Sequence, residues 1–334
     1  MAVPVSFGIN VNTRVPIIFP DSYSVRQLLA LAEEAEALGY DAVWVGDNFL
    51  SKARLEALTT LGALAARTRR VRLGTAACIA PLRHTVWLAA SWATLDQLSG
   101  GRMLLNLCVG GGSAEAAGPA FRLEFDVAGI PYAKRGRILE EQIELLRALW
   151  TGKPVAYQGA HHQLPEIEVH PRPVQQPTPP IWVSNNPQIF EMSSGVVERM
   201  LRRVARLADG WMTCLATPEE YRQLWGRIQQ YARETGRAPE SLQAGYQMTL
   251  NVHPDRARAR AEGLAYINRY YTTGYRSLEE SMWARDPFGP PDECAAAIRA
   301  MIDAGARTFA LRFGSPDQAG QLRRFTETVL PRLR

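Results

Sequence analysis

The residues of this sequence best suited to chemistry are polar side chains that interrupt or follow short apolar runs. Strict alternation puts Asn106 and Cys108 on one face of an otherwise apolar run, and Arg312 stands in the same relation to its neighbours. Asp47 closes another such run, and Asn10 lies near the end of the first one. Amide, thiol, guanidinium and carboxylate groups can hold a ligand by hydrogen bonds, but no nucleophile among them is paired with a base. The set therefore favours a protein that orients a cofactor carrying its own chemistry.

The elements that could position these side chains follow from hydrophobic periodicity along the chain. Helical patterns separate eight shorter runs that are typical of strands. Eight strands alternating with helices favour a single (β/α)8 TIM barrel over residues 1–334. The alternative is an open doubly wound sheet, but no G-x-G-x-x-G motif opens a helix after the first strand. The strands are expected at residues 5–11, 41–47, 71–79, 103–109, 180–184, 210–215, 244–252 and 308–313.

Three irregular stretches interrupt this alternation. We expect insertions at about residues 111–135 after the fourth strand, 152–179 before the fifth strand and 271–289 after the seventh strand. The second insertion contains two short runs on either side of Gly159 and should form a surface hairpin. Because active sites of barrels lie at the carboxyl ends of the strands, the first and third insertions are expected to cover the site as a lid.

Composition argues against several other kinds of function. The formal net charge is +5, but the 38 basic residues are interspersed with 33 acidic ones rather than gathered in a patch for nucleic acid. No apolar run approaches the roughly 20 residues that a membrane-spanning helix needs. The first ten residues lack the pattern of a signal peptide, so we expect a cytoplasmic protein that acts on a small molecule. Neither a disulfide framework nor a metal site is expected, because the cysteines are scattered: Cys78, Cys108, Cys214 and Cys294.

Five segments of the chain carry a family resemblance. They are AEEAEALGYDAVWVGD (32–47), LGTAACIAPLRHTVW with LDQLSGGRMLLNLCVGGG (within 73–112), RILEEQIELLRALWTG (137–152), PRPVQQPTPPIWV (171–183) and ARLADGW (205–211). In this order and spread, the sequence resembles the bacterial luciferase-like family of flavin-dependent oxidoreductases. The resemblance implies a barrel that binds FMN or the deazaflavin coenzyme F-420 at its C-terminal face, and a homodimer.

The resemblance also gives roles to individual residues. Ala76 and Ala77 match a position where the family carries a non-proline cis peptide against the isoalloxazine ring, although two alanines could merely fit a tight barrel. Asn106 matches an asparagine that contacts the flavin in some FMN-using monooxygenases and is glycine in many deazaflavin enzymes; its alternative is a structural amide. Cys108 matches the thiol near the reactive flavin carbon of the luciferases, although a buried cysteine more often serves as a small apolar residue.

The cofactor phosphate has three candidate sites in the sequence. Glycines expose backbone N–H groups and turn amides form concavities for anions. A barrel commonly binds phosphate after its seventh and eighth strands. The candidates are Gly110-Gly111-Gly112, the turn Ser184-Asn185-Asn186, and Arg312 with Gly314.

One departure from the family concerns proton transfer. Many relatives have a histidine, often a catalytic acid or base, directly after the residue that matches Asp47, but this chain has Asn48. An amide can donate a hydrogen bond but does not titrate near neutral pH. His84 is the nearest alternative base, although a structural histidine opening a helix is the simpler interpretation. The candidate catalytic groups are therefore Asp47, Asn48, His84 and Arg312.

Three functions remain compatible with these residues. The first is a monooxygenase that uses reduced FMN from a separate flavin reductase, with Asp47, Asn106 and Arg312 holding the ring and the substrate. The second is a dehydrogenase or reductase that transfers hydride with coenzyme F-420. The third is a flavin-binding barrel without turnover, which is suggested by Asn48. Dimer formation could use large apolar residues of one helix, unless all of them pack on the barrel: Trp87, Leu88 and Trp92.

Overall fold

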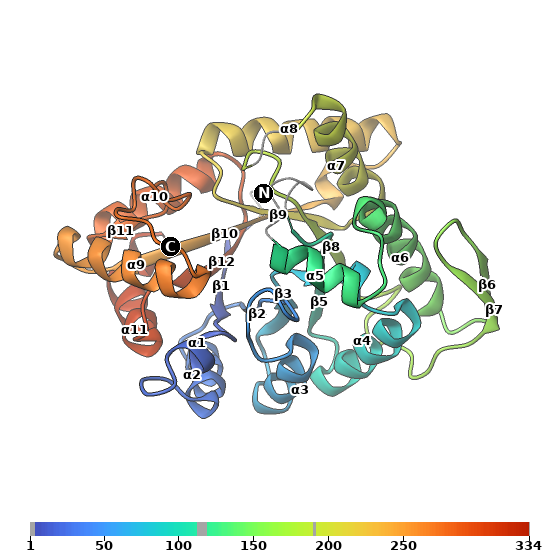
Figure 1. Ribbon diagram of the computed structural model, residues 1–334, viewed down its shortest axis with the longest axis horizontal. Coiled ribbons are helices and arrows are strands. Elements are labelled where there is room, and N and C mark those ends of the chain that lie inside the picture. The colour runs from blue at the N-terminus through green and yellow to red at the C-terminus, as the bar shows by residue number, and fades with distance from the viewer. Residues whose placement is uncertain (1–3, 112–118, 190–191, 334) are drawn as a thin grey trace.

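The strands of the protein form a closed barrel, as the sequence predicts (Figure 1). The computed structural model describes residues 4–111, 119–189 and 192–333, and within them eight parallel strands are joined side by side. The order β10-β12-β1-β2-β3-β5-β8-β9 is closed by the pairing of β9 with β10. The barrel strands are β1 (Ser6–Val11), β2 (Ala42–Val45), β3 (Arg72–Thr75), β5 (Met103–Cys108), β8 (Ile181–Ser184), β9 (Gly210–Cys214), β10 (Gln243–Val252) and β12 (Thr308–Phe313).

Helices cover the outside of this barrel (Figure 1). Ser24 begins one of them with a capping box, in which its hydroxyl accepts from the N–H of Gln27 and the Gln27 side chain accepts from the N–H of Ser24. The helices are α1 (Val15–Ile18), α2 (Val25–Ala37), α3 (Ala57–Arg67), α4 (Thr85–Ser99), α5 (Pro119–Val127), α6 (Arg135–Leu149), α7 (Ser194–Leu207), α8 (Pro218–Glu234), α9 (Arg256–Tyr271), α10 (Pro291–Asp303) and α11 (Gln318–Thr328). None of the helices in the described ranges is long and apolar enough to cross a bilayer.

Two indole rings fill the barrel interior. Trp44 of β2 and Trp182 of β8 are buried, with ring centroids 6.0 Å apart. Each ring occupies space that glycines leave on facing strands: a Cβ at Gly74 would lie 2.6 Å from Trp44, and one at Gly210 would lie 2.5 Å from Trp182. Two further glycines, Gly8 and Gly245, meet the same two rings. The barrel is therefore packed beneath its mouth, and open space lies above these rings.

The insertions differ in part from expectation. The predicted hairpin is confirmed, since β6 (Val155–Gln158) and β7 (Gln163–Ile167) pair antiparallel beyond α6 (Figure 1). Residues 112–118 of the first insertion, Gly112 included, lie outside the described residues. Its described part forms α5, which the sequence analysis did not foresee. Also unforeseen were two short elements, α1 and β11 (Phe288–Gly289). The strand predicted at 71–79 is divided into β3 and β4 (Cys78–Ile79).

The aromatic stretch at 271–289 packs onto the fold. Trp283 and Phe288 are buried, and the Trp283 ring stacks on Tyr271 with centroids 4.2 Å apart. On α4, the expectation of an apolar dimer surface needs correction. Leu88 and Trp92 are buried in the barrel's own core, and Trp87 alone of the three is exposed, by 71%.

Candidate active site

A cavity of about 1150 Å³ opens at the carboxyl ends of the barrel strands. Its wall combines apolar side chains, such as Ile79, Phe121 and Met212, with a larger set of polar and basic ones. A concave and partly apolar site at this face is where barrel enzymes bind cofactors and substrates. The sequence-predicted site residues on its wall are Asp47, Asn48, Ala76, Ala77, Cys108, Gly110, Gly111, Ser184 and Asn185.

The peptide bond between Ala76 and Ala77 is cis, as the resemblance implies. It connects β3 to β4, and both alanines line the cavity. The Ala76 N–H donates to the Val45 carbonyl oxygen at 2.7 Å, which ties this connection to β2. A flat ring could approach the backbone here without meeting a bulky side chain at either position.

Cys108 lies beside this peptide, with its Sγ 3.9 Å from the Ala77 carbonyl oxygen. Burial raises the pKa of the Cys108 thiol to about 12, although a hydrogen bond from the Gly110 backbone opposes the rise. The thiol is therefore protonated at neutral pH, and Cys108 is not a ready thiolate nucleophile.

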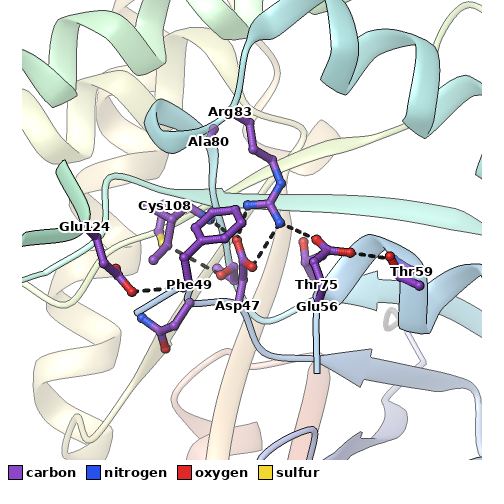
Figure 2. Close-up of polar contacts among 12 residues, drawn as sticks. Asp47, Phe49, Glu56, Thr59, Thr75, Ala80, Arg83, Cys108 and Glu124 are labelled. Atoms are coloured by element: carbon purple, nitrogen blue, oxygen red, sulfur yellow. Dashed lines mark hydrogen bonds and ion pairs between the residues drawn. The ribbon is translucent and has the colours of Figure 1, made fainter. Parts of the chain in front are cut away.

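Both oxygens of the Asp47 carboxylate accept hydrogen bonds within the protein (Figure 2). Arg83 Nη1 donates to Oδ2 at 2.6 Å and Nη2 donates to Oδ1 at 3.1 Å. The Ile79 N–H adds a bond of 2.9 Å to Oδ2. Arg83 also pairs with Glu56 at 2.7 Å, and its guanidinium lies 4.6 Å from the centroid of the Phe49 ring. Asp47 therefore fixes the cavity wall between β2 and α4, and its acceptor positions already have donors.

The loop after Asp47 is held by a second acid. Glu124 of α5 is buried, and its Oε1 accepts from the backbone N–H groups of Phe49, Leu50 and Ser51 at 2.6–2.9 Å (Figure 2). Asn48 donates from Nδ2 to Ser51 Oγ at 3.0 Å. Its amide thus supports the loop from a position on the cavity wall, without a group that titrates near neutral pH.

Asn106 points into the barrel, as alternation predicts, but lies one layer below the cavity wall. It is completely buried, and its Oδ1 accepts from Ser184 Oγ at 3.0 Å. Its Nδ2 lies 3.4 Å from the sulfur of Met212. Since Ser184 and Met212 both line the cavity, Asn106 fixes two wall residues from beneath.

A row of basic residues on one side of the cavity was missed by the sequence analysis. Among them, Arg203 is paired with Glu140 at 2.9 Å, and Arg135 donates from Nε to the Gly110 carbonyl oxygen at 3.3 Å. The other members of the row form no ion pair with any described residue. The row, which we call the cationic wall, consists of Lys134, Arg135, Arg137, Arg199 and Arg203. The sequence signal was the Arg135-Gly136-Arg137 start of a helix, followed in α7 by arginines at Arg199 and Arg203.

The residues of the predicted phosphate-binding turns also have structural roles. Gly110 and Gly111 both have positive φ angles, of 72° and 63°. A Cβ on Gly110 would meet Ile79 at 2.6 Å, so a side chain there is sterically excluded. Asn185 accepts from the indole N–H of Trp211 at 3.0 Å. The glycines are therefore required by packing and conformation, and the cationic wall is the stronger feature for an anion.

Besides Asn106, three of the predicted site residues do not line this cavity. His84 is exposed at the start of α4, with its ring centroid 6.2 Å from that of Trp87. Asn10 is buried near the end of β1, and Arg312 is buried in β12, where it donates to Thr249 Oγ1. The structure thus separates His84 from the other candidates, while Asn10 and Arg312 belong to the opposite side of the barrel mouth.

The arrangement fits a cofactor with a flat ring and an anionic side chain. Ala76 and Ala77 offer a surface of small side chains, and the cationic wall offers donors for phosphate or carboxylate oxygens. Within the described ranges, no three His, Cys, Asp or Glu side chains are grouped so that they could hold a metal ion.

Comparison with known proteins finds one matching family model and relatives that are oxidoreductases. A family model described as luciferase-like monooxygenase matches residues 5–328. The F420-dependent glucose-6-phosphate dehydrogenase of Amycolatopsis mediterranei is 27% identical over 341 residues, covering 94% of this chain and 96% of the relative. The oxygenase component of flavin-dependent trigonelline monooxygenase from Acinetobacter baylyi is 31% identical over 160 residues, covering 47% of this chain and 42% of the relative. A solved F420-dependent secondary alcohol dehydrogenase, in complex with an F420-acetone adduct, has the same fold, with a TM-score of 0.77, 21% identity and 99% coverage of both chains.

Proposed function

Since the chain belongs to the luciferase-like monooxygenase family of oxidoreductases, we propose that it is a hydride-transferring dehydrogenase or reductase that uses coenzyme F-420. The observation that carries this choice is the cationic wall, with five basic side chains on one side of a single cavity. FMN ends in one phosphate, whereas coenzyme F-420 continues beyond its phosphate into a chain of carboxylates. The near full-length likeness to F420-dependent dehydrogenases supports the same choice.

The chain's own residues would divide the work as follows. Ala76 and Ala77 leave room for the ring, and the cationic wall binds the anionic side chain. The Asp47–Arg83 ion pair holds the segment after β2 against the segment before α4, and so fixes the shape of the cavity. When bound, the deazaflavin accepts or gives a hydride at its ring. An alcohol that gives up a hydride from its carbon must also lose its hydroxyl proton, and Asp286 is a buried carboxyl near the mouth whose pKa burial raises to about 7.

A monooxygenase that uses reduced FMN is the second candidate. It is favoured by the local likeness to a flavin-dependent oxygenase component over about half of the chain. In that case a separate flavin reductase would be a partner, and the cavity would have to exclude water from an oxygen-dependent reaction.

Two measurements separate these candidates. The first is mass spectrometry of the small molecule that co-purifies from a host able to make both cofactors. The second is anaerobic titration of the purified protein with reduced FMN and with reduced coenzyme F-420. Tight binding of the deazaflavin alone supports the proposal, while tight binding of FMN alone, with oxygen consumption, would replace it by the monooxygenase.

A matched pair of variants on α7 tests the cationic wall. Arg199 lines the cavity, whereas Arg202 lies on the surface and pairs with Glu198 and Glu234. Arg199→Gln should weaken binding of coenzyme F-420 about tenfold, as expected for one charge-assisted contact. Arg202→Gln should leave binding unchanged. Binding without any consumption of cofactor or oxygen over a broad substrate panel would instead favour a barrel that binds flavin without turnover.

A further inference from the structure

Across the barrel mouth from the cationic wall, a second group of basic residues surrounds two tyrosines. The Arg14 guanidinium lies 5.0 Å from the centroid of the Tyr270 ring, and that of Arg312 lies 5.2 Å from Tyr270 and 5.4 Å from Tyr271. Arg54 reaches the same region, since its guanidinium interacts with the Tyr270 hydroxyl, and its Nη1 occupies the space left by the missing side chain of Gly46. We call Arg14, Arg54 and Arg312 the arginine cluster.

The arginine cluster lacks counter-charges. Among the described residues, no carboxylate forms an ion pair with Arg14, Arg54 or Arg312. Arg14 is only 3% exposed, and its Nε and Nη1 have no hydrogen-bond partner; Nε of Arg54 is also buried without one. Burying a guanidinium with unsatisfied donors is costly, so these donors point to a ligand that the folded protein alone does not supply.

Arg312 shows how the cluster is supported. Its Nη2 donates to Thr249 Oγ1 at 2.6 Å, and its Nη1 donates to the Tyr271 hydroxyl at 2.6 Å. The nearest acid in this network is Asp286, which accepts from the Thr249 N–H at 3.0 Å and is thus separated from Arg312 by Thr249. Thr249 therefore holds the guanidinium in place without neutralising it.

The arginine cluster adjoins the cavity on two strands. Gln247 lines the cavity, and Thr249 follows two positions later on the same face of β10. Directly after β2, Asp47 lines the cavity, and Gly46, which makes room for Arg54, precedes it. A ligand that extends from Ala76 and Ala77 toward these strands would meet the cluster.

We propose that the arginine cluster binds an oxyanion, a carboxylate or a phosphate, carried by the substrate. The guanidinium fork matches both groups through paired hydrogen bonds. The cofactor's own phosphate has the cationic wall on the other side of the mouth, so the cluster is left for the second reactant. That the bound anion belongs to a substrate rests on the proposed function. The inference adds the chemical class of this substrate: an anionic molecule whose reacting carbon lies between the arginine cluster and Ala76–Ala77.

Tyr270 provides a direct probe of the site. Burial alone would raise the pKa of its hydroxyl, but Arg54, Arg312 and Arg14 outweigh burial and lower it below the ordinary tyrosine value. An oxyanion bound among these arginines would offset part of their charge and move the Tyr270 pKa upward. The other charged or titratable groups that face this site are Lys52, Tyr266, Tyr271 and Asp286.

The test is a titration of tyrosinate absorbance on the full chain, without cofactor. It is run in chloride, acetate and inorganic phosphate at matched ionic strength, and Tyr270→Phe identifies the transition that belongs to Tyr270. We expect acetate or phosphate to move this transition to higher pH. The anion that moves it further shows whether the site prefers a carboxylate or a phosphate. Equal transitions in all three salts would overturn the proposal.

Two substitutions locate the effect. Arg54→Gln should weaken binding of the more effective anion at least about tenfold, as expected for the loss of a charge-assisted hydrogen bond. Arg14→Lys, which keeps the charge but loses the fork, is the second variant if the first does not fold. The control is Arg256→Gln, because Arg256 is exposed at the start of α9 and pairs with Glu293, outside the arginine cluster. Equal anion affinity in the cluster variants and the control would also overturn the proposal.

The outcome can be told apart from failure of the proposed function, because the titration needs neither cofactor nor turnover. Activity with coenzyme F-420 but no anion effect on Tyr270 would overturn the anion site alone. An anion effect in a protein that binds only FMN would overturn the cofactor assignment and leave the anion site standing.

Discussion

The Asp47 carboxylate is bound by the Arg83 guanidinium in a two-point ion pair of 2.6 and 3.1 Å, and both side chains are at most 9% exposed. The sequence suggested Asp47 as a residue that holds the cofactor ring. Both of its oxygens accept hydrogen bonds from Arg83 or from the Ile79 N–H, so Asp47 also fixes the shape of the cavity wall, whereas direct contact with the cofactor stays a prediction.

Asp47→Asn should lower the free energy of unfolding by about 1–3 kcal/mol, because the buried Arg83 loses its two-point partner and keeps only Glu56. The matched control is Glu33→Gln, which removes the exposed partner of Arg67 and should cost at most about 1 kcal/mol. Urea denaturation of both variants measures the difference. Equal losses would mean that the Asp47–Arg83 pair contributes no more than a surface pair.

Asn106→Ala should destabilise the protein by roughly 1–3 kcal/mol, because Ser184 Oγ loses a buried acceptor. Ser184→Ala removes the same hydrogen bond from the other side and should have a similar effect. Thermal melting and cofactor affinity are measured on both variants. If Asn106→Ala weakens cofactor binding tenfold while Ser184→Ala does not, Asn106 contacts the cofactor itself. Asn106→Gly, the residue of many deazaflavin relatives, should weaken FMN more than coenzyme F-420.

Asp286 should make stability depend on pH between its unfolded and folded pKa values. Burial raises its pKa from 3.8 to about 7. From about pH 4 to pH 7 the folded state therefore holds a proton that the unfolded state has released, so stability from this group falls as pH rises and levels off above pH 7. The loss is on the order of a few kcal/mol. Denaturation across this range should show a smaller decline in Asp286→Asn, and an unchanged decline would contradict the assignment.

The homodimer remains a prediction that Trp87 can test. Its side chain is 71% exposed on α4, and Leu98, further along the same helix, is 61% exposed. If α4 forms a subunit interface, Trp87→Glu should convert the dimer into a monomer of 37.1 kDa in sedimentation equilibrium at micromolar concentration. A wild-type protein that is already monomeric there would contradict the prediction, and a variant that stays dimeric would move the interface to another surface.

Local sequence patterns predicted the parts of the structure that depend on neighbours in the chain. The alternation of residues in β5 correctly predicted that Asn106 points into the barrel, and the order of strands and helices predicted the barrel itself. The same patterns could not pair Asp47 with Arg83, which lies 36 residues away, nor bring Arg14 beside Arg312. The first contact depends on the pairing of β2 with β3. The second depends on barrel closure, which places β1 and β12 side by side. The sequence also suggested His84 as a base, whereas the structure shows that the adjacent Arg83 is the residue that binds the cavity wall, through Asp47.

The two tryptophans inside the barrel restrict how this chain can evolve. Because Trp44 fills the space that Gly8 and Gly74 leave, and Trp182 the space at Gly210 and Gly245, no one of these positions can enlarge alone. A larger residue at Gly74 becomes tolerable only after Trp44 has been replaced by a smaller one, so the order of substitutions matters. Homologues should therefore exchange these residues as correlated sets, while the residues around the mouth change one at a time. New substrates in this lineage would then arise by replacing mouth residues above an inherited interior.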